Sequence, residues 1–238
     1  TGTGAAIKFI DGASNNTVKS CIVESQNTVV TSGTIFFSTS TGAAVTTGNS
    51  NNIISGCDVR DRSDVTGVPA NGVYSSGTAA LPNAANKISG CNVFNFTNSG
   101  VMVEAAGAGD GWVINPSSFY QTAPRTAQLR FINSLGGSGH AIRNNTIGGS
   151  DPSAGGTYTS VANDFYGIYL TVGTASATSV QGNTVKNIRA SSGSFGCNGI
   201  YANTGYLSIG DIAGNTIGSA DSLQRLGLCP GGVHGLRR

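Results

Sequence analysis

The stretch Ile142-Arg143-Asn144-Asn145-Thr146-Ile147 carries the pattern that decides the fold: an aliphatic residue, two residues, then Cys, Ser or Asn, one residue and another apolar residue. The pattern occurs seven times, with starts separated by 36, 34, 26, 28, 38 and 32 residues. The other six copies are Val18-Cys21-Val23, Ile54-Cys57-Val59, Ile88-Cys91-Val93, Ile114-Ser117-Phe119, Val180-Asn183-Val185 and Ile212-Asn215-Ile217. A repeat of this period indicates a stack in which each unit buries its apolar face against its neighbours.

A second motif, Gly followed by an aliphatic and a large residue, keeps step with the first. It occurs as Gly72-Val73-Tyr74, Gly100-Val101-Met102, Gly167-Ile168-Tyr169 and Gly199-Ile200-Tyr201, and we assign the equivalent places in other units to Ile7-Lys8, Ile35-Phe36 and Leu129-Arg130. Apolar and polar residues alternate with period two in both motifs, between segments rich in Gly, Asn, Ser and Thr, which is typical of strands and turns. Each unit therefore contains at least two short strands.

The composition agrees with an all-β chain. There are 36 Gly, and only 10% of the 238 residues are charged. No segment has the helical periodicity that leucine-rich, ankyrin or tetratricopeptide repeats require. A stack of β coils remains.

The column of Cys, Ser and Asn has a physical reason in such a stack. Equivalent residues of parallel coils lie about 4.8 Å apart, so identical polar side chains can hydrogen-bond from coil to coil, as Asn ladders do. We expect Asn145, Asn183 and Asn215 to satisfy one another in this way. The column begins with three Cys at 21, 57 and 91, which we expect to be reduced because stacked side chains are badly oriented for a disulfide. A bridge between Cys197 and Cys229 is left open.

These repeats resemble the right-handed parallel β-helix of the pectate-lyase-like superfamily over residues 5–219, and are similar to large bacterial secreted or surface proteins. The resemblance implies an all-β, right-handed, single-stranded parallel β-helix, or solenoid, of about seven coils. It also implies an extracellular or cell-surface location in a bacterium. The superfamily includes polysaccharide lyases and hydrolases, tailspikes and adhesins, so it narrows the function only to these classes.

We divide the chain into a β-helix domain, residues 1–222, and a tail without repeats, residues 223–238, which is either a cap or a truncation artefact. The tail supplies three Arg and no acid to a chain of net charge +2, so the basic pI gives no reason to expect nucleic acid as a partner. No apolar run of 18 residues is present, and we expect no membrane span. Neither end carries an amphipathic helix that could cap a solenoid, so we expect the chain to be part of a longer protein.

One column should point outward, because its residues follow the buried aliphatic of the second motif. Its predicted members are Lys8, Phe36, Tyr74, Met102, Arg130, Tyr169 and Tyr201. Of these, Phe36, Tyr74, Tyr169 and Tyr201 are our candidates for binding a polysaccharide or cell-surface glycan, because aromatic rings pack against the C–H face of a sugar. The alternative is that they stack only to stabilise the sheet.

Candidate catalytic residues are few. Glu104 and Arg130 are predicted near this column, and His140 follows Gly137-Ser138-Gly139, a weak likeness to the Gly-His-Gly of polygalacturonases. Glycoside hydrolysis needs two carboxylates, and only Glu104 is in a strand. Asp58, Asp61 and Asp64 form a weak candidate calcium site, although Arg60 and Arg62 between them favour surface ion pairs. No other cofactor is expected.

Two functions therefore remain in view. The first is a secreted or cell-surface β-helix module that binds glycan through the aromatic column or serves as a rigid adhesin segment. The second is a polysaccharide lyase or glycoside hydrolase with its site on the same face.

Overall fold

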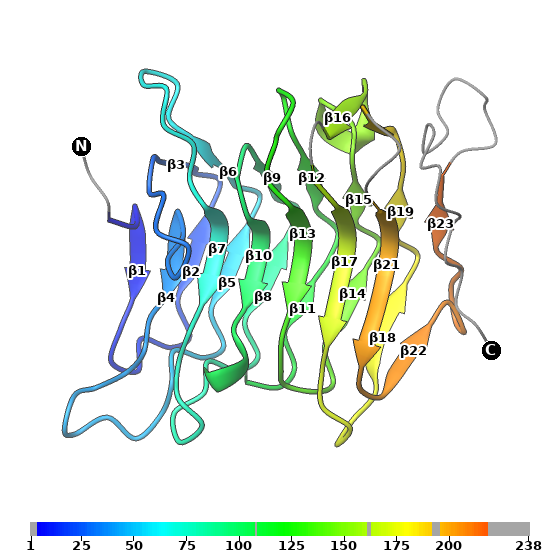
Figure 1. Ribbon diagram of the computed structural model, residues 1–238. Helices are drawn as coiled ribbons and strands as arrows, with labels where there is room; N and C mark the ends of the chain where they lie inside the picture. The colour runs from blue at the N-terminus through cyan, green and yellow to red at the C-terminus, as the bar shows by residue number, and fades with distance from the viewer. Residues whose placement is uncertain (1–3, 108, 161–162, 192–195, 219–238) are drawn as a thin grey trace.

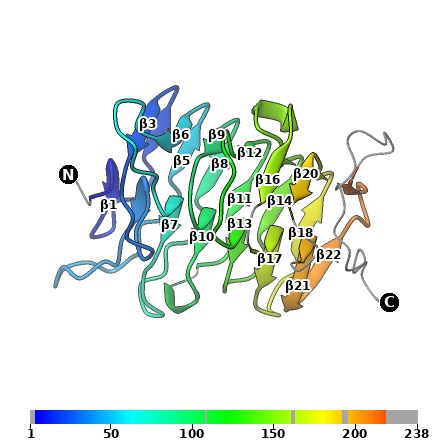
Figure 2. The same ribbon diagram turned by 45° about the horizontal axis from the view of Figure 1, so that its top comes forward.

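The computed structural model describes residues 4–107, 109–160, 163–191 and 196–218. Within them the chain winds into a parallel β-solenoid of about six turns, with three sheets running the length of the stack (Figures 1 and 2). The all-β parallel solenoid predicted from the repeats is confirmed, and its right-handedness stays a prediction. The predicted tail, residues 223–238, lies outside the described residues. The expectation that it is a cap or a truncation artefact, and the question of a bridge to Cys229, therefore fall outside them as well.

Each coil contributes one strand to each sheet and so has three strands, which agrees with the prediction of at least two. Sheet A is formed by β1 (Ile7–Phe9), β4 (Ile35–Phe37), β7 (Asn71–Ser75), β10 (Ser99–Val103), β13 (Leu129–Ser134), β17 (Phe165–Thr171) and β21 (Cys197–Thr204). Sheet B is formed by β2 (Thr17–Lys19), β5 (Ile53–Ser55), β8 (Lys87–Ser89), β11 (Val113–Ile114), β14 (Ala141–Arg143), β18 (Thr178–Gln181) and β22 (Leu207–Ile209). Sheet C is formed by β3 (Ile22–Ser25), β6 (Asp58–Asp61), β9 (Asn92–Phe94), β12 (Ser118–Tyr120), β15 (Thr146–Ile147), β19 (Thr184–Val185) and β23 (Thr216–Ile217).

The remaining elements lie outside the three sheets. Strands β16 (Tyr158–Ser160) and β20 (Ile188–Ala190) pair with each other, and two short 3₁₀ turns, η1 (Ala105–Gly107) and η2 (Pro152–Ala154), lie in connections. In the part of the chain that is described, no helix has the length and apolar character needed to cross a bilayer.

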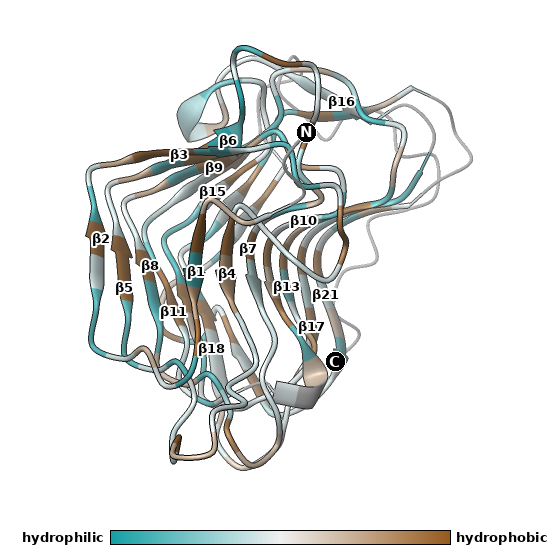
Figure 3. Cartoon of the chain, turned by 90° about the vertical axis from the view of Figure 1, so that its left-hand side faces the viewer, coloured by the Kyte–Doolittle hydropathy of each residue, from teal (hydrophilic) through white to brown (hydrophobic). Residues whose placement is uncertain are grey.

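The core runs along the axis of the stack, as the apolar segments of the strands in Figure 3 indicate. Ile54 of sheet B, Val93 of sheet C and Val101 of sheet A are fully buried and belong to one continuous cluster. The recurring Gly of sheet A has a steric reason: a Cβ on Gly167 would lie 2.4 Å from the carbonyl oxygen of Gly199 on the next coil. The coils therefore approach one another too closely here for any side chain.

The predicted Asn ladder is present. The backbone N–H and the Nδ2 of Asn145 both donate to Oδ1 of Asn183 at 3.0 Å, and those of Asn183 both donate to Oδ1 of Asn215 at 2.9 Å. Nδ2 of Asn183 also donates to the Ile142 carbonyl at 2.9 Å. Each buried amide is thus satisfied by its neighbours, as the sequence predicted.

The first half of the same column is a thiol ladder. The backbone N–H groups of Cys21 and Cys57 donate to Sγ of the next Cys at 3.5 Å, and that of Cys91 donates to Oγ of Ser117 at 3.2 Å. The three thiols are free, as expected, with Cys21 exposed and the other two buried. Burial raises the pKa of Cys91 to about 11.

A second ladder, which the repeat search missed, precedes sheet B. The backbone N–H of Asn16 donates to Oδ1 of Asn52, and that of Asn52 donates to Oδ1 of Asn86, both at 2.9 Å. The expectation for Ile212 is wrong: Ile209 pairs with Val180, and Ile212 is 79% exposed. Ile209 precedes Asn215 by three more positions than Val180 precedes Asn183 in the coil before. Ile212 lies in this longer connection and faces outward.

Candidate functional site

The outer column of sheet A is defined by the strand register. It contains Lys8, Phe36, Tyr74, Met102, Asn133, Tyr169 and Tyr201. Arg130 was assigned to this column wrongly, because Ile132 and not Leu129 pairs with Ile168. Arg130 instead pairs with Ser99 and Tyr166. It lies three residues before Asn133, which holds the column position on this strand. Phe131 stands where the neighbouring coils have Gly, and this substitution hid the alignment.

The N-terminal half of the column is largely packed against the protein itself. The rings of Phe36 and Tyr74 meet edge to face, with centroids 5.6 Å apart, and Nζ of Lys8 lies 5.6 Å from the centroid of Phe36. Tyr74 is only 2% exposed, and its hydroxyl donates to Oε2 of Glu104 at 3.0 Å. Burial, with the Glu104 carboxylate beside it, raises the pKa of Tyr74. In this half the rings pack against neighbouring side chains of the sheet, and glycan binding by Phe36 and Tyr74 stays a prediction.

The C-terminal half forms a more exposed group, which we call the Tyr/Arg cluster: Arg130, Tyr166, Tyr169 and Tyr201. The rings of Tyr169 and Tyr201 stack with centroids 5.0 Å apart, and Tyr166 meets each of them edge-on at 5.3 Å. The Arg130 guanidinium lies 4.7 Å from the centroid of Tyr169 and 5.5 Å from that of Tyr166. Tyr201 is 37% exposed. These strands lie side by side on the face of the stack toward the viewer in Figure 1.

The Tyr/Arg cluster is held in place by its surroundings. The Tyr166 hydroxyl donates to Oδ2 of Asp164 at 3.4 Å, while the Gly196 N–H donates to the other oxygen of this carboxylate at 2.7 Å. In the described part of the chain, Arg130 forms no ion pair. Sequence reasoning found Tyr169 and Tyr201 but missed Tyr166, although its place directly before Gly167 of the repeat was a usable signal.

The three candidate catalytic residues are not brought together. Arg130 pairs with Ser99, which is five residues before Glu104, so the two side chains start about 15 Å apart along the sheet. His140 is buried directly before β14, at the place that Asn86 of the second ladder holds before β8. Its Nδ1 accepts a bond from the Trp112 N–H at 3.2 Å, and its Nε2 bonds the Gly136 carbonyl at 2.9 Å. Burial lowers the pKa of His140, and both ring nitrogens have structural partners.

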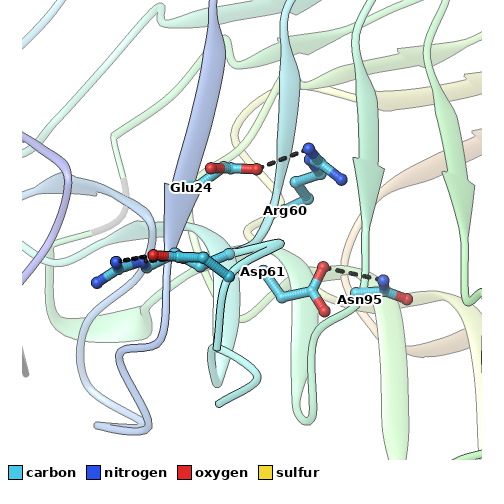
Figure 4. A network of polar contacts seen from close by, with 6 residues as sticks. Glu24, Arg60, Asp61 and Asn95 are labelled. Atoms are coloured by element: carbon cyan, nitrogen blue, oxygen red, sulfur yellow. Dashed lines mark hydrogen bonds and ion pairs between the residues drawn. The ribbon is translucent and has the colours of Figure 1, made fainter. Parts of the chain in front are cut away.

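The acidic segment of β6 and the loop after it is also engaged in local contacts. Arg60 forms an ion pair with Glu24 at 2.7 Å, and Nδ2 of Asn95 donates to Asp61 at 2.9 Å (Figure 4). Asp64 pairs with Arg62 at 2.5 Å, and Asp58 accepts a bond from Asn92 at 2.8 Å. Among the residues described, no group of three or more His, Cys, Asp or Glu could hold a metal ion. A calcium site at Asp58, Asp61 and Asp64 stays a prediction.

One cavity of about 470 Å³ lies on another part of the surface, beside η2. It is lined by residues 152–157 together with Lys186 and Asn187. None of the residues predicted from the sequence lines it, and it shares no residue with the Tyr/Arg cluster.

Comparisons of the chain with protein-family models, with curated proteins and with solved structures found no match. The assignment of a parallel solenoid therefore rests on the sheet topology and on the ladders described above.

Proposed function

We propose that the chain is a glycan-binding β-solenoid module and that the Tyr/Arg cluster is its binding surface. The observation that carries the proposal is a set of three tyrosine rings in mutual contact on the outer face of sheet A, two of which also contact Arg130. Tyr201, the third, is 37% exposed. Tyrosine combines an apolar ring with a polar hydroxyl. A sugar likewise has C–H groups, which can pack on the ring, and hydroxyls, which can hydrogen-bond to the tyrosine hydroxyl.

The rigidity of the surface supports the proposal. Stacking and the hydrogen bond to Asp164 already restrict the rings, so little side-chain entropy is lost when a ligand binds. The Arg130 guanidinium, which forms no ion pair within the described residues, adds donors beside the rings. The repeat places such groups at regular steps of about 4.8 Å, which suits an extended chain of sugars.

The wider setting is part of the same proposal. We place the module in a secreted or cell-surface bacterial protein, as an adhesin-like segment of a longer chain related to the pectate-lyase-like superfamily. The support is the repeat pattern and its likeness to that superfamily. The alternative, a polysaccharide lyase or hydrolase, has less support: Glu104 is bonded to Tyr74, Arg130 is distant from it, and His140 is buried.

A glycan-array screen with the wild-type chain, Tyr201→Ala and Tyr206→Ala tests the proposal. Tyr206 is a matched control because it is 56% exposed and lies outside the cluster. We expect wild type and Tyr206→Ala to bind the same glycans and Tyr201→Ala to lose them. Absence of binding by the wild type, or equal binding by all three, would refute the proposal. Depolymerisation of a bound polysaccharide that Glu104→Gln abolishes would establish the enzyme instead.

A further inference from the structure

An unusual group of buried polar atoms lies beside the Tyr/Arg cluster. Oγ of Ser99, Nε of Arg130 and both amide atoms of Asn133 are buried and have no hydrogen-bond partner among the described residues. Asn133 is 1% exposed. Because the great majority of buried polar side-chain atoms in proteins are hydrogen-bonded, four such atoms on the neighbouring strands β10 and β13 need an explanation.

The fold itself does not require an amide at position 133. In the register of sheet A, Met102 precedes Asn133 in its column and Tyr169 follows it. Asn183 of the ladder has every amide group satisfied by adjacent coils, whereas neither amide atom of Asn133 bonds to its column neighbours Met102 and Tyr169. The place on β10 that corresponds to Asn133 is occupied by Met102, which has no amide.

The position of Asn133 links it to the proposed binding surface. It is next to Tyr169 across the strands, and Arg130, three residues earlier on β13, covers the Tyr169 ring at 4.7 Å. Met102, on its other side, has a flexible unbranched side chain that can move to admit a ligand. The unpaired amide is therefore buried beside the Tyr/Arg cluster, and a sugar bound there reaches it only once the Met102 side chain moves.

We infer that Asn133 is the specificity-determining residue of this surface and recognises a pyranose unit with two adjacent free hydroxyls. An amide offers an acceptor and a donor side by side, and each sugar hydroxyl can act as either. Oδ1 accepts from one hydroxyl and Nδ2 donates to the next. The inference rests on the proposed glycan binding. It goes further by naming the chemical feature of the glycan that the protein recognises.

This role gives substitutions at position 133 an unusual signature. Asn133→Met introduces the residue that β10 carries at the equivalent place and removes two unsatisfied atoms, so the unfolding midpoint should stay the same or rise. Binding of the array-selected glycan should fall at least tenfold. A residue needed only for the fold would lower stability and binding together.

The test is a titration of wild type, Asn133→Met and Asn133→Leu with the array-selected oligosaccharide and with its deoxy analogues that lack one hydroxyl each. We expect the wild type to discriminate at least tenfold against one analogue and both variants to bind the parent and that analogue alike, with unchanged or higher denaturation midpoints. If the variants keep wild-type affinity and discrimination while Tyr201→Ala loses binding, this inference is wrong and the proposed function stands. If the wild type binds no glycan, both are wrong, and a lowered midpoint in both variants would assign Asn133 to the fold.

Discussion

Replacing Asn183 by Ala tests the idea that the buried ladder is a main source of the stability of the stack. The side chain of Asn183 takes part in four hydrogen bonds, with Asn145 twice, with the Ile142 carbonyl and with Asn215. The change leaves the Asn145 N–H and the Ile142 carbonyl without these partners in a buried place. At about 1 kcal/mol net for a hydrogen bond and more for a group left unsatisfied, we expect a loss of about 4 kcal/mol.

Equilibrium unfolding in urea, followed by the fluorescence of the single, buried Trp112, measures this loss. Asn203→Ala is the matched control, because Asn203 is exposed and has one side-chain bond, to Thr171; its effect should stay within about 0.5 kcal/mol. Asn183→Ser should fall between the two, since Ser117 shows that a hydroxyl in this column can accept the backbone N–H of the preceding coil. An Asn183→Ala variant within 1 kcal/mol of the control would refute the reasoning.

Two further predictions concern buried titratable groups. Iodoacetamide at pH 8 should label Cys21 and spare Cys57 and Cys91 in the folded protein, because only the first thiol is exposed and burial raises the pKa of Cys91 to about 11; peptide mass spectrometry measures it, and equal labelling of all three would contradict the buried ladder. Burial also lowers the pKa of His140 below its unfolded value of about 6.5, so the unfolded state binds this proton first and stability should fall as the pH drops from 7 toward 5. The variant His140→Asn keeps an acceptor for the Trp112 N–H and should flatten the pH dependence of the unfolding midpoint. An unchanged slope in this variant would show that other groups cause the pH dependence.

Much of the fold could be predicted because the stack repeats its contacts. The Asn column was found from spacing alone, since a buried amide next to two apolar positions has few other ways to be satisfied. The second ladder was missed because Asn16, Asn52 and Asn86 stand among many other Asn and Ser residues, which look like ordinary turns in the sequence. The burial of Asn52 and Asn86, which is complete, depends on the three-dimensional fold.

The site was harder to predict because its residues depend on register more than on spacing. Replacement of the repeat Gly by Phe131 shifted Arg130 by three residues in our alignment and concealed Asn133. The contacts of Tyr166 with Tyr169 and Tyr201 bring together residues of adjacent coils and of two different columns, which no single motif records. The difference in exposure between Tyr74, which is buried, and Tyr201, which is exposed, has no periodic signal in the sequence.

The most direct test of the central claim, that the Tyr/Arg cluster binds glycan, is a calorimetric titration of the array-selected oligosaccharide into wild type, Tyr201→Ala and Tyr206→Ala. Loss of one ring contact of about 1.4 kcal/mol corresponds to a tenfold weaker Kd. We predict a tenfold or greater increase in Kd for Tyr201→Ala and none for Tyr206→Ala. Equal Kd values for Tyr201→Ala and the wild type would contradict the account.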